Sequence, residues 1–369
     1  MGNRYQLPLC TTCRMSDNPI SERIDRRTLL RGAAAAGVVG IAGCSDNGGD
    51  GGDGSDGSDG SDGSDGMDGD DGSDGSDGED GGSADVIRWH AGGTGGTYFP
   101  LSGEFEGIIE NNTDYPVEVS STGASVENVG SLGNGDADFA LIQNDVAYFA
   151  RNGEGLDAFD GSPVENLRGV ATLYPETIHV LLNPEADVSS LSDLEGMRVN
   201  TGDLGSGTQV NALQILESAA GLTTDDFEEQ NTDFTQAANQ LRDGDVDAAF
   251  VVGGWPVGAV EELATTTDVQ ILNMSDEERQ AARDDASWFA DDTIPGGTYE
   301  GIDEDVNTVS VQAMIATRSE YSADAVESVT EAIFENVDQL SIKTNFISVD
   351  SAQDGMSIEL HEGAARYFE

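Results

Sequence analysis

The sequence predicts a two-lobed α/β fold for residues 85–369, with a mainly parallel sheet flanked by helices in each lobe. Short apolar runs alternate with segments of helical periodicity, an order typical of such a sheet. The same order recurs in the second half of this segment, and its 285 residues are enough for two lobes. Because open α/β sheets bind ligands at the carboxyl ends of their strands, we expect a hinge and a ligand cleft between the lobes.

In the first half, apolar runs predict strands over residues 86–91, 117–121, 138–142, 170–173 and 179–182. Helical periodicity predicts helices between them, over residues 97–112, 125–132 and 145–151. The first of these helices carries Leu101, Phe105 and Ile109 on one face, so we expect it to pack on the sheet.

In the second half, the same patterns predict strands over residues 197–201, 247–252, 269–272 and 306–316. Helices are predicted over residues 208–220, 237–241, 256–263 and 323–340. The last of these is long, and we expect it to close the fold.

Residues 1–44 have the pattern of an export leader. Two arginines at positions 26 and 27 precede a short apolar stretch rich in Ala and Gly, as in a twin-arginine signal. The stretch ends in Gly43 and Cys44, and a small residue before cysteine is what a lipoprotein signal peptidase requires. A spanning helix is the alternative, but it needs roughly 20 apolar residues. We therefore expect cleavage after Gly43 and a lipid on Cys44 that anchors the chain to the extracellular face of the cell membrane.

Residues 45–84 consist mainly of Gly, Ser and Asp, with 14 acidic and no basic residues. Such a segment has almost nothing apolar to bury, and its like charges extend it. Calcium-binding repeats of similar composition carry a large apolar residue in each turn, and here only Met67 is available. The composition therefore predicts a disordered acidic linker that holds residues 85–369 away from the membrane.

The whole chain is strongly acidic, with 71 acidic and 16 basic residues and a net charge of −55 at pH 7. Residues 85–369 alone contain 54 acidic and 10 basic residues, and Lys343 is the only lysine. This self-repulsion is screened at molar salt, where the Debye length is about 3 Å. We interpret the composition as that of a halophile, most consistent with a haloarchaeon, with a merely acidic protein as the alternative. The same charge disfavours binding to nucleic acid or to anionic lipid surfaces.

Three junctions between a predicted strand and a predicted helix are rich in Gly, Ser and Thr: residues 92–98, 120–125 and 202–208. Glycine lets a ligand approach the backbone, Ser or Thr caps the following helix, and the free N–H groups of its first turn point outward. This combination binds small carboxylates without a lysine or arginine. Ordinary helix caps explain any one of these loops, but three at like positions in both halves favour a binding site.

Signals for nucleotide binding and catalysis are weak. The first loop does not complete Gly-x-Gly-x-x-Gly, because Tyr98 occupies the last place. The three histidines lack ligand spacing, and His179 is interpreted as a core residue. Ser206 lacks the first glycine of a nucleophile elbow, since Leu204 stands there. We therefore expect no enzyme activity, no catalytic residues, no cofactor and no metal site.

Seven segments, spread over nearly all of residues 86–369, carry a family resemblance when they are taken together. They are Gly93-Thr94-Gly95-Gly96-Thr97-Tyr98-Phe99-Pro100-Leu101, Thr122-Gly123-Ala124-Ser125-Val126-Glu127-Asn128, Ala137-Asp138-Phe139-Ala140-Leu141-Ile142-Gln143-Asn144-Asp145, Leu173-Tyr174-Pro175-Glu176, Gly205-Ser206-Gly207-Thr208, Ile294-Pro295-Gly296-Gly297-Thr298-Tyr299 and His361-Glu362-Gly363-Ala364-Ala365. In this order they resemble the extracytoplasmic solute receptors of TRAP transporters, in their TAXI branch. Asn144, where Ser is usual, and Gly123-Ala124-Ser125, where Gly-Ser is commoner, depart from the family pattern.

The resemblance implies a periplasmic-binding-protein-like fold and a ligand-binding subunit that delivers its solute to a membrane permease driven by an ion gradient. Family ligands are small organic acids and amino acids, including glutamate-like and dicarboxylate compounds. A related binding protein of another transporter or of a sensor kinase, an exported enzyme on the same fold, and a structural cell-surface protein are the alternatives that the sequence leaves open.

We expect the ligand to lie between the lobes, with main-chain N–H groups and the hydroxyls of Thr97, Ser206 and Thr208 binding a carboxylate. The predicted ligand-binding residues are Thr94, Gly95, Thr97, Tyr98, Thr122, Ser125 and Gln143 on lobe one, Tyr174 near the crossover, and Ser206, Gly207, Thr208, Gly254 and Trp255 on lobe two. Trp255 or Tyr98 would cover the apolar part of the ligand, with a core role as the alternative for Trp255. Closure is expected around a hinge near residues 174–184 and near the strand after Val306.

Overall fold

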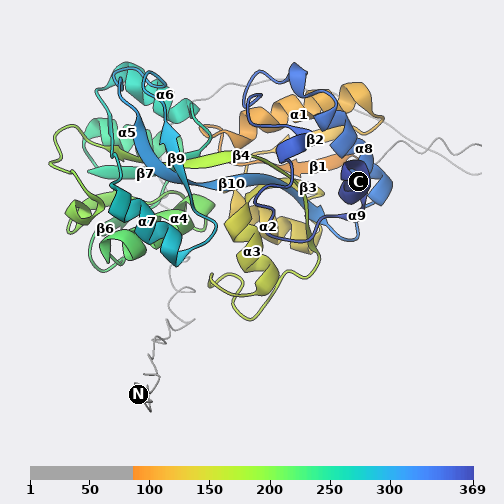
Figure 1. The fold of residues 1–369 in the computed structure, drawn as a ribbon, viewed down its shortest axis with the longest axis horizontal. Coiled ribbons are helices and arrows are strands. Elements are labelled where there is room, and N and C mark those ends of the chain that lie inside the picture. Colours follow the sequence, from red (N-terminus) through yellow and green to blue (C-terminus); the bar gives the residue numbers. More distant parts are fainter. Residues whose placement is uncertain (1–85) are drawn as a thin grey trace, which may run out of the picture. The chain divides into compact units, whose positions relative to one another are not determined.

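The structure is a computed structural model that describes residues 86–369. The export leader, Cys44 and the 45–84 linker lie outside the described residues. Figure 1 shows the described part as two lobes side by side, with strands β4 (Leu167–Leu182) and β10 (Val306–Arg318) running through both.

Lobe one combines the N-terminal elements with the last helices of the chain. Its strands are β1 (Ile87–His90), β2 (Val117–Ser120) and β3 (Phe139–Gln143). Its helices are α1 (Tyr98–Asn112), α2 (Ser125–Asn134), α3 (Asn144–Asn152), α8 (Ala323–Phe334) and α9 (Glu362–Phe368).

Lobe two is formed by the middle of the chain. Its strands are β5 (Arg198–Asn200), β6 (Glu228–Gln230), β7 (Ala248–Gly253), β8 (Gln270–Ile271) and β9 (Ala290–Ile294). Its helices are α4 (Gly207–Ile215), which continues into a π turn (Leu216–Ala220), α5 (Phe234–Asp243), α6 (Gly258–Thr266) and α7 (Asp276–Asp285). Three short 3₁₀ turns complete the described elements: Leu191–Leu194, Val337–Gln339 and Val349–Ser351.

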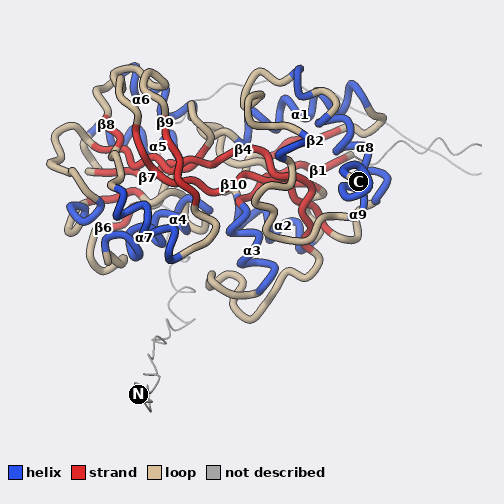
Figure 2. Tube along the Cα trace, in the orientation of Figure 1, coloured by secondary structure: helices blue, strands red, loops and turns tan. Residues whose placement is uncertain are grey.

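One sheet of ten strands passes through both lobes, in the order β2-β1-β3-β10-β4-β7-β5-β6, with β8 paired to β4 and β9 to β10. β1 is parallel to β2 and β3, and β5 is parallel to β6 and β7. The crossing strands β4 and β10 are antiparallel to each other and to their outer neighbours β7 and β3. Figure 2 shows the strands as a red band from lobe to lobe. The predicted parallel groups are therefore present in each lobe, but a mixed sheet unites them.

The strands predicted over residues 170–173 and 179–182 are a single strand, β4. Pro175 lies opposite Gln312 of β10 and Glu176 opposite Val311, so the pairing continues through both residues. Proline and glutamate are disfavoured in a central strand, which is why the sequence predicts a break. β7 pairs with β4 only from Thr177 onward, so Pro175 loses no hydrogen bond on that side.

Each lobe has two hydrophobic cores, one on each face of the sheet. In lobe one, the core under α1 and α8 contains Trp89 and Phe105, and the core under α2 and α3 contains Leu132. In lobe two, α5 and α6 cover one core and α4 and α7 the other. Leu173 belongs to a core of lobe one and Ile178 to a core of lobe two, so β4 leaves one lobe and enters the other between them.

The structure corrects some predicted elements. The helix predicted over residues 323–340 ends at Phe334, because the side-chain amide of Asn336 donates to the carbonyl of Ala332 at 2.8 Å and lets the chain turn. The patterns also miss β6, α7, β9 and α9; β6 has the sequence Glu-Glu-Gln, and α7 buries only Ala282. Among residues 86–369, no helix has both the length and the apolar character needed to cross a membrane.

Candidate functional site

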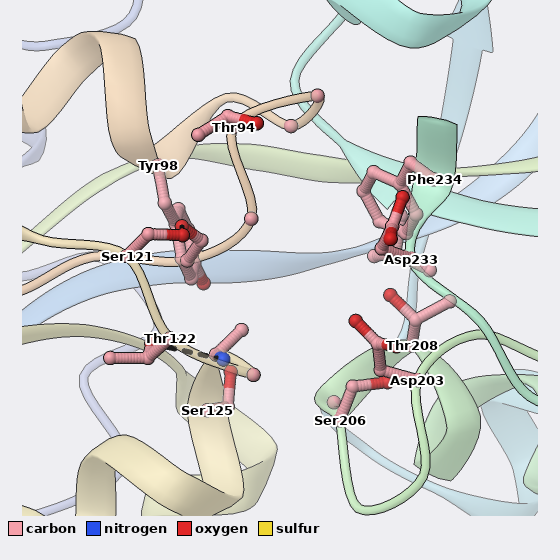
Figure 3. Close-up of a pocket in the computed structure, with 18 of the residues that line it drawn as sticks. Thr94, Tyr98, Ser121, Thr122, Ser125, Asp203, Ser206, Thr208, Asp233 and Phe234 are labelled. Atoms are coloured by element: carbon pink, nitrogen blue, oxygen red, sulfur yellow. Dashed lines mark hydrogen bonds between the residues drawn. The ribbon is translucent and has the colours of Figure 1, made fainter. Parts of the chain in front are cut away.

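A cavity of about 690 Å³ lies between the lobes, where the three Gly-rich loops follow the carboxyl ends of β1, β2 and β5. Figure 3 shows Tyr98 and Ser125 of lobe one facing Ser206 and Thr208 of lobe two. The structure places ten of the thirteen predicted residues in the lining: Thr94, Gly95, Thr97, Tyr98, Thr122, Ser125, Gln143, Ser206, Gly207 and Thr208.

The other three predicted residues, Tyr174, Gly254 and Trp255, lie behind the lining. Tyr174 is buried, and its hydroxyl donates to Oε1 of Glu176 at 3.3 Å. The main-chain carbonyls of Gly254 and Trp255 accept hydrogen bonds from Nζ of Lys343 at 2.5 and 2.7 Å. The indole of Trp255 packs edge-on against a phenylalanine ring, at residue 346, with 5.6 Å between centroids. None of these three residues belongs to the described lining of the cavity.

All three loops begin helices, but only one uses its Ser or Thr as a cap. Ser206 caps α4, and its Oγ accepts from the main-chain N–H of Gln209 at 3.1 Å. The hydroxyl of Thr97 instead donates to the carbonyl of residue 254 in lobe two at 3.2 Å. α2 is preceded by Ala124 at φ 67°, while Oγ of Ser125 accepts from a main-chain N–H of β3. The first N–H groups of α4 have no acceptor within the helix, so they are available as donors at the cavity.

Glu176 forms the floor of the cavity and is 3% exposed. Its Oε2 accepts from the hydroxyl of Tyr98 at 3.1 Å and from Nε2 of Gln143 at 3.3 Å, and its Oε1 accepts from Tyr174. Burial raises the pKa of Glu176 to about 7, although these hydrogen bonds oppose the rise. Within the described residues, the carboxylate forms no ion pair.

The mouth of the cavity is also acidic. Asp203 and Asp233 line it from lobe two. Oδ1 of Asp233 caps α5 by accepting from the main-chain N–H of Gln236 at 2.9 Å. Burial, together with the charges of Asp233 and Glu127, raises the pKa of Asp203. The described lining contains no Lys, Arg or His, so its ionisable side chains are all acids or tyrosine.

The lobes are in contact on both sides of the cavity. On one side, the main-chain N–H of Ala259 in α6 donates to the carbonyl of Gly95 at 3.0 Å. On the other side, Asn211 of α4 donates to Asp145 of α3 at 2.7 Å. The structure is therefore a form in which the lobes enclose the cavity.

Lys343 joins the lobes behind the cavity floor. It lies in the segment after α8, next to Ile347 in the core of lobe one, and is 9% exposed. Its Nζ bonds the carbonyls of residues 254–255 in lobe two and lies 5.9 Å from the ring centre of Tyr174. Burial lowers the pKa of Lys343 to about 8, while the charge of Glu176 acts in the opposite direction.

Several lining residues fall outside the predicted set, among them Glu176, Asp203, Asn231, Asp233 and Phe234. Asp203 lies in a loop that the sequence singles out, and Asp233 precedes a helix as an N-cap, so a local signal was available for both. Glu176 ends one of the seven segments that carry the family resemblance, but that segment does not indicate its place at the floor, which depends on where β4 crosses between the lobes.

His179 has the structural role that the sequence predicts. Its Nδ1 donates to the carbonyl of Thr177 at 3.0 Å, and its Nε2 accepts from the hydroxyl of Tyr299 at 2.9 Å. Burial lowers the pKa of His179 to about 4, which keeps the ring neutral. Over residues 86–369, no group of three or more His, Cys, Asp or Glu side chains is arranged to hold a metal ion.

Comparison with known structures finds remote likenesses. The chain is similar to the substrate-binding protein of an amino acid ABC transporter, with 14% identity over 71% of this chain and 96% of that one and a TM-score of 0.42. It is similar to the periplasmic aliphatic sulphonate-binding protein SsuA from Escherichia coli, with 13% identity, 78% and 83% coverage and a TM-score of 0.41. It is also similar to a mutant of ArgBP from T. maritima, with 13% identity, 70% and 91% coverage and a TM-score of 0.43.

Comparison with protein families finds a match over almost all of the described chain. The model of the NMT1-like family matches residues 90–369, a range that includes both lobes and all three Gly-rich loops of the cavity. This chain therefore belongs to the NMT1-like family.

Proposed function

We propose that this chain is the extracytoplasmic solute-binding subunit of a membrane transporter, which captures a small organic acid or amino acid between its lobes. The observation that carries the proposal is the cavity of about 690 Å³, enclosed by two lobes and lined by three Gly-rich loops. A cavity of this volume suits a small molecule. Two strands connect the lobes, a connection that allows opening and closing about a hinge.

The chemistry of the cavity supports binding and not turnover. The described lining contains no histidine that would act as a base for Ser206, and Oγ of Ser206 already accepts from the main-chain N–H of Gln209. A hydrolase needs a nucleophile within hydrogen-bond reach of a base. These observations support a receptor over a hydrolase.

The transporter is of the TRAP type, in its TAXI branch, and its ligand is a glutamate-like or dicarboxylate compound. Support comes from the seven segments in family order, because several of them, including residues 93–98 and 205–208, contribute to the lining. The partner is then a permease driven by an ion gradient. The arginine pair and Cys44 support export by the twin-arginine pathway and a lipid anchor on the extracellular face.

A thermal-shift screen of the purified full-length chain in multimolar KCl or NaCl tests the binding function. A small carboxylate or amino acid that binds only the native state raises the melting temperature by mass action. We expect a saturable shift with one compound, and a smaller radius of gyration by small-angle scattering if the free protein opens. Folded protein that shows no shift with any compound would contradict the solute-binding function.

Transport assays separate a TRAP permease from other partners. Uptake of the bound compound into cells should require this chain, stop when the ion gradient is collapsed, and continue when ATP is depleted. Uptake that follows ATP and not the gradient would assign the chain to another class of transporter. Cys44→Ser should release the protein from the membrane fraction if the lipid anchor is present.

A further inference from the structure

The floor of the cavity contains hydrogen-bond acceptors that the protein leaves open. An ionised carboxylate offers about four acceptor positions, and Tyr98, Gln143 and Tyr174 fill three of those on Glu176. Gln143 is 2% exposed and directs its Nε2 to Glu176, which leaves its Oε1 buried without a hydrogen-bond partner. Both Glu176 and Gln143 line the cavity, so a bound solute is positioned to supply the missing donors.

Positive charge is missing from the same place. Asp203 and Asp233 add carboxylates at the mouth, and no Lys, Arg or His belongs to the described lining. Lys343 lies behind the floor, but its ammonium donates to the main-chain carbonyls of residues 254–255. A buried carboxylate is unfavourable unless a cation or hydrogen-bond donors compensate it. The cavity is therefore complementary to a cation that enters with the solute.

We propose that the solute carries an ammonium group, which binds at the cavity floor and donates to the carboxylate of Glu176 and to Oε1 of Gln143. An ammonium group has three donors and no acceptor, which matches a floor where acceptors are open. A carboxylate on the same solute lies toward the free N–H groups at the start of α4, which begins at Gly207 beside Gln143. This inference rests on the proposed solute-binding function and narrows its ligands to compounds with an amine. It disfavours dicarboxylates that lack one.

Other occupants of the floor match its chemistry less well. A hydroxyl group has one donor, so it fills one acceptor position and leaves the charge of Glu176 unpaired. A metal ion also supplies charge, but over residues 86–369 no group of three or more His, Cys, Asp or Glu side chains is arranged to hold one, whereas Ca²⁺ and Mg²⁺ take six or more oxygen ligands.

Matched pairs of probes test the proposal with the unmodified full-length chain in multimolar KCl. In each pair a hydroxyl group replaces one amine: L-alanine with L-lactate, L-glutamate with α-hydroxyglutarate, and γ-aminobutyrate with γ-hydroxybutyrate. In a fourth pair, putrescine with 1,4-butanediol, hydroxyl groups replace both amines. Thermal shift ranks the pairs, and calorimetry measures the dissociation constants. We expect the amine of the best pair to bind at least about 10-fold more tightly than its partner, as a charge-assisted hydrogen bond provides.

A charge-neutral variant then tests whether the preference for the amine compound depends on Glu176 at the cavity floor. Glu176→Gln keeps the shape of the side chain and removes its charge, so the ratio within the best pair should fall to less than about 3-fold. Glu277→Gln, on the exposed first turn of α7, is the matched control and should retain the full ratio. If Glu176→Gln fails to fold, the matched probe pairs on the wild-type protein still test whether the solute needs an amine.

The outcomes separate this inference from the proposed function. If an amine-free acid binds as tightly as its amine partner, the solute-binding function stands and the ammonium site is wrong. If exchange of K⁺ for Na⁺ changes the melting temperature of the wild type but not of Glu176→Gln, and no amine preference is found, the floor holds a metal ion and the proposal fails. If no probe binds folded protein, both the inference and the solute-binding function are contradicted.

Discussion

Asn211 of α4 donates a hydrogen bond to Oδ2 of Asp145 in α3 at 2.7 Å, and this bond joins two fully buried residues of different lobes. The remaining oxygen of each side chain, Oδ1 in both, has no partner in the described part of the chain. Burial raises the pKa of Asp145 to about 6. Buried acceptors without donors lose the hydrogen bonds that water would give them, which costs free energy. The contact therefore joins the lobes, but it also destabilises the closed form, and opening the lobes would expose both oxygens to water.

Asp145→Asn should therefore stabilise the closed form. The new amide can donate to Oδ1 of Asn211 while its oxygen still accepts from Asn211, so a reciprocal pair replaces one bond and two unsatisfied oxygens. We expect a gain of about 1 kcal/mol for the closed form and an affinity about 5-fold higher for whichever compound binds. Calorimetry measures the affinity, and Asp136→Asn at an exposed site of lobe one is the control. Equal affinities in the wild type and Asp145→Asn would show that this contact does not govern closure.

Gly207, the first residue of α4, packs directly against lobe one. A Cβ at position 207 would lie 1.7 Å from Oε1 of Gln143 and 3.1 Å from Oγ of Ser125. Gly207→Ala should therefore keep the lobes apart and weaken solute binding by about 10-fold or more, through an overpacking cost of about 1–3 kcal/mol. Small-angle scattering should show that the variant stays open when solute is added.

The matched control for this steric effect is Gly130→Ala, in the middle of α2, where an added Cβ has no atom within 4 Å. Alanine is the better helix former, so this variant should be more stable by about 0.5–1 kcal/mol and bind normally. Closure and binding that survive in Gly207→Ala would mean that the side chain of residue 143 can move away.

Glu176 should make the free protein less stable as the pH rises. Its pKa is about 7 in the folded state and about 4.3 when unfolded, so between these values the folded state holds the extra proton. The unfolding free energy is then highest below about pH 4.5 and falls as the pH passes through 7. The shift corresponds to about 4 kcal/mol. Asp145 and Lys343, the other groups near this carboxyl with pKa values between about 6 and 8, are present in both proteins compared below. Burial raises the pKa values of Tyr98 and Tyr174 further above their usual range, so both phenols stay neutral at pH 5 and pH 8.

Denaturant unfolding of the wild type and Glu176→Gln at pH 5 and pH 8, in the same molar salt, isolates this contribution. Glu176→Gln should gain stability relative to the wild type at pH 8 and lose that advantage at pH 5, because it has no carboxyl to ionise. Glu277→Gln should follow the wild type at both pH values. Parallel pH profiles for the wild type and Glu176→Gln would contradict a raised pKa at the floor.

Lys343→Met should weaken the contact between the lobes behind the cavity floor. Methionine retains the apolar stem but removes the ammonium, which leaves the carbonyls of residues 254–255 without their donor. We expect a loss of about 1–3 kcal/mol in unfolding free energy and faster amide hydrogen exchange in residues 253–258. Arg242→Met, at an exposed end of α5, provides the control for loss of one positive charge. Unchanged exchange would show that Lys343 does not hold this segment.

The net charge of −55 should make stability depend strongly on salt. The Debye length grows from about 3 Å at 1 M to about 10 Å at 0.1 M, so repulsion between carboxylates increases on dilution. We expect the melting temperature by calorimetry to fall steadily from about 3 M to about 0.1 M KCl. Sucrose, which is uncharged, should restore much less of it. A melting temperature that does not change with salt would contradict the interpretation as a halophilic protein.

Local sequence patterns predicted many of the strands and helices correctly. The strands near residues 86–91, 117–121 and 138–142 and the loops that follow them are present, because apolar periodicity and helix-start residues act over a few positions. The sequence patterns gave a wrong prediction where pairing between strands outweighed the local conformational preference of the residues. β4 continues through Pro175 and Glu176 because β10 pairs with both residues.

The site divides in the same way. The sequence by itself determined many of the strands and helices, β1, β2 and β3 among them, and the three loops that line the cavity, since these depend on residues that are neighbours in the chain. Only the tertiary structure decided that Glu176 forms the floor, and that residues 254–255 lie behind it. Glu176 is buried because Tyr98 and Gln143, which are distant in sequence, meet it where β4 crosses between the lobes. No local pattern records a contact of that kind.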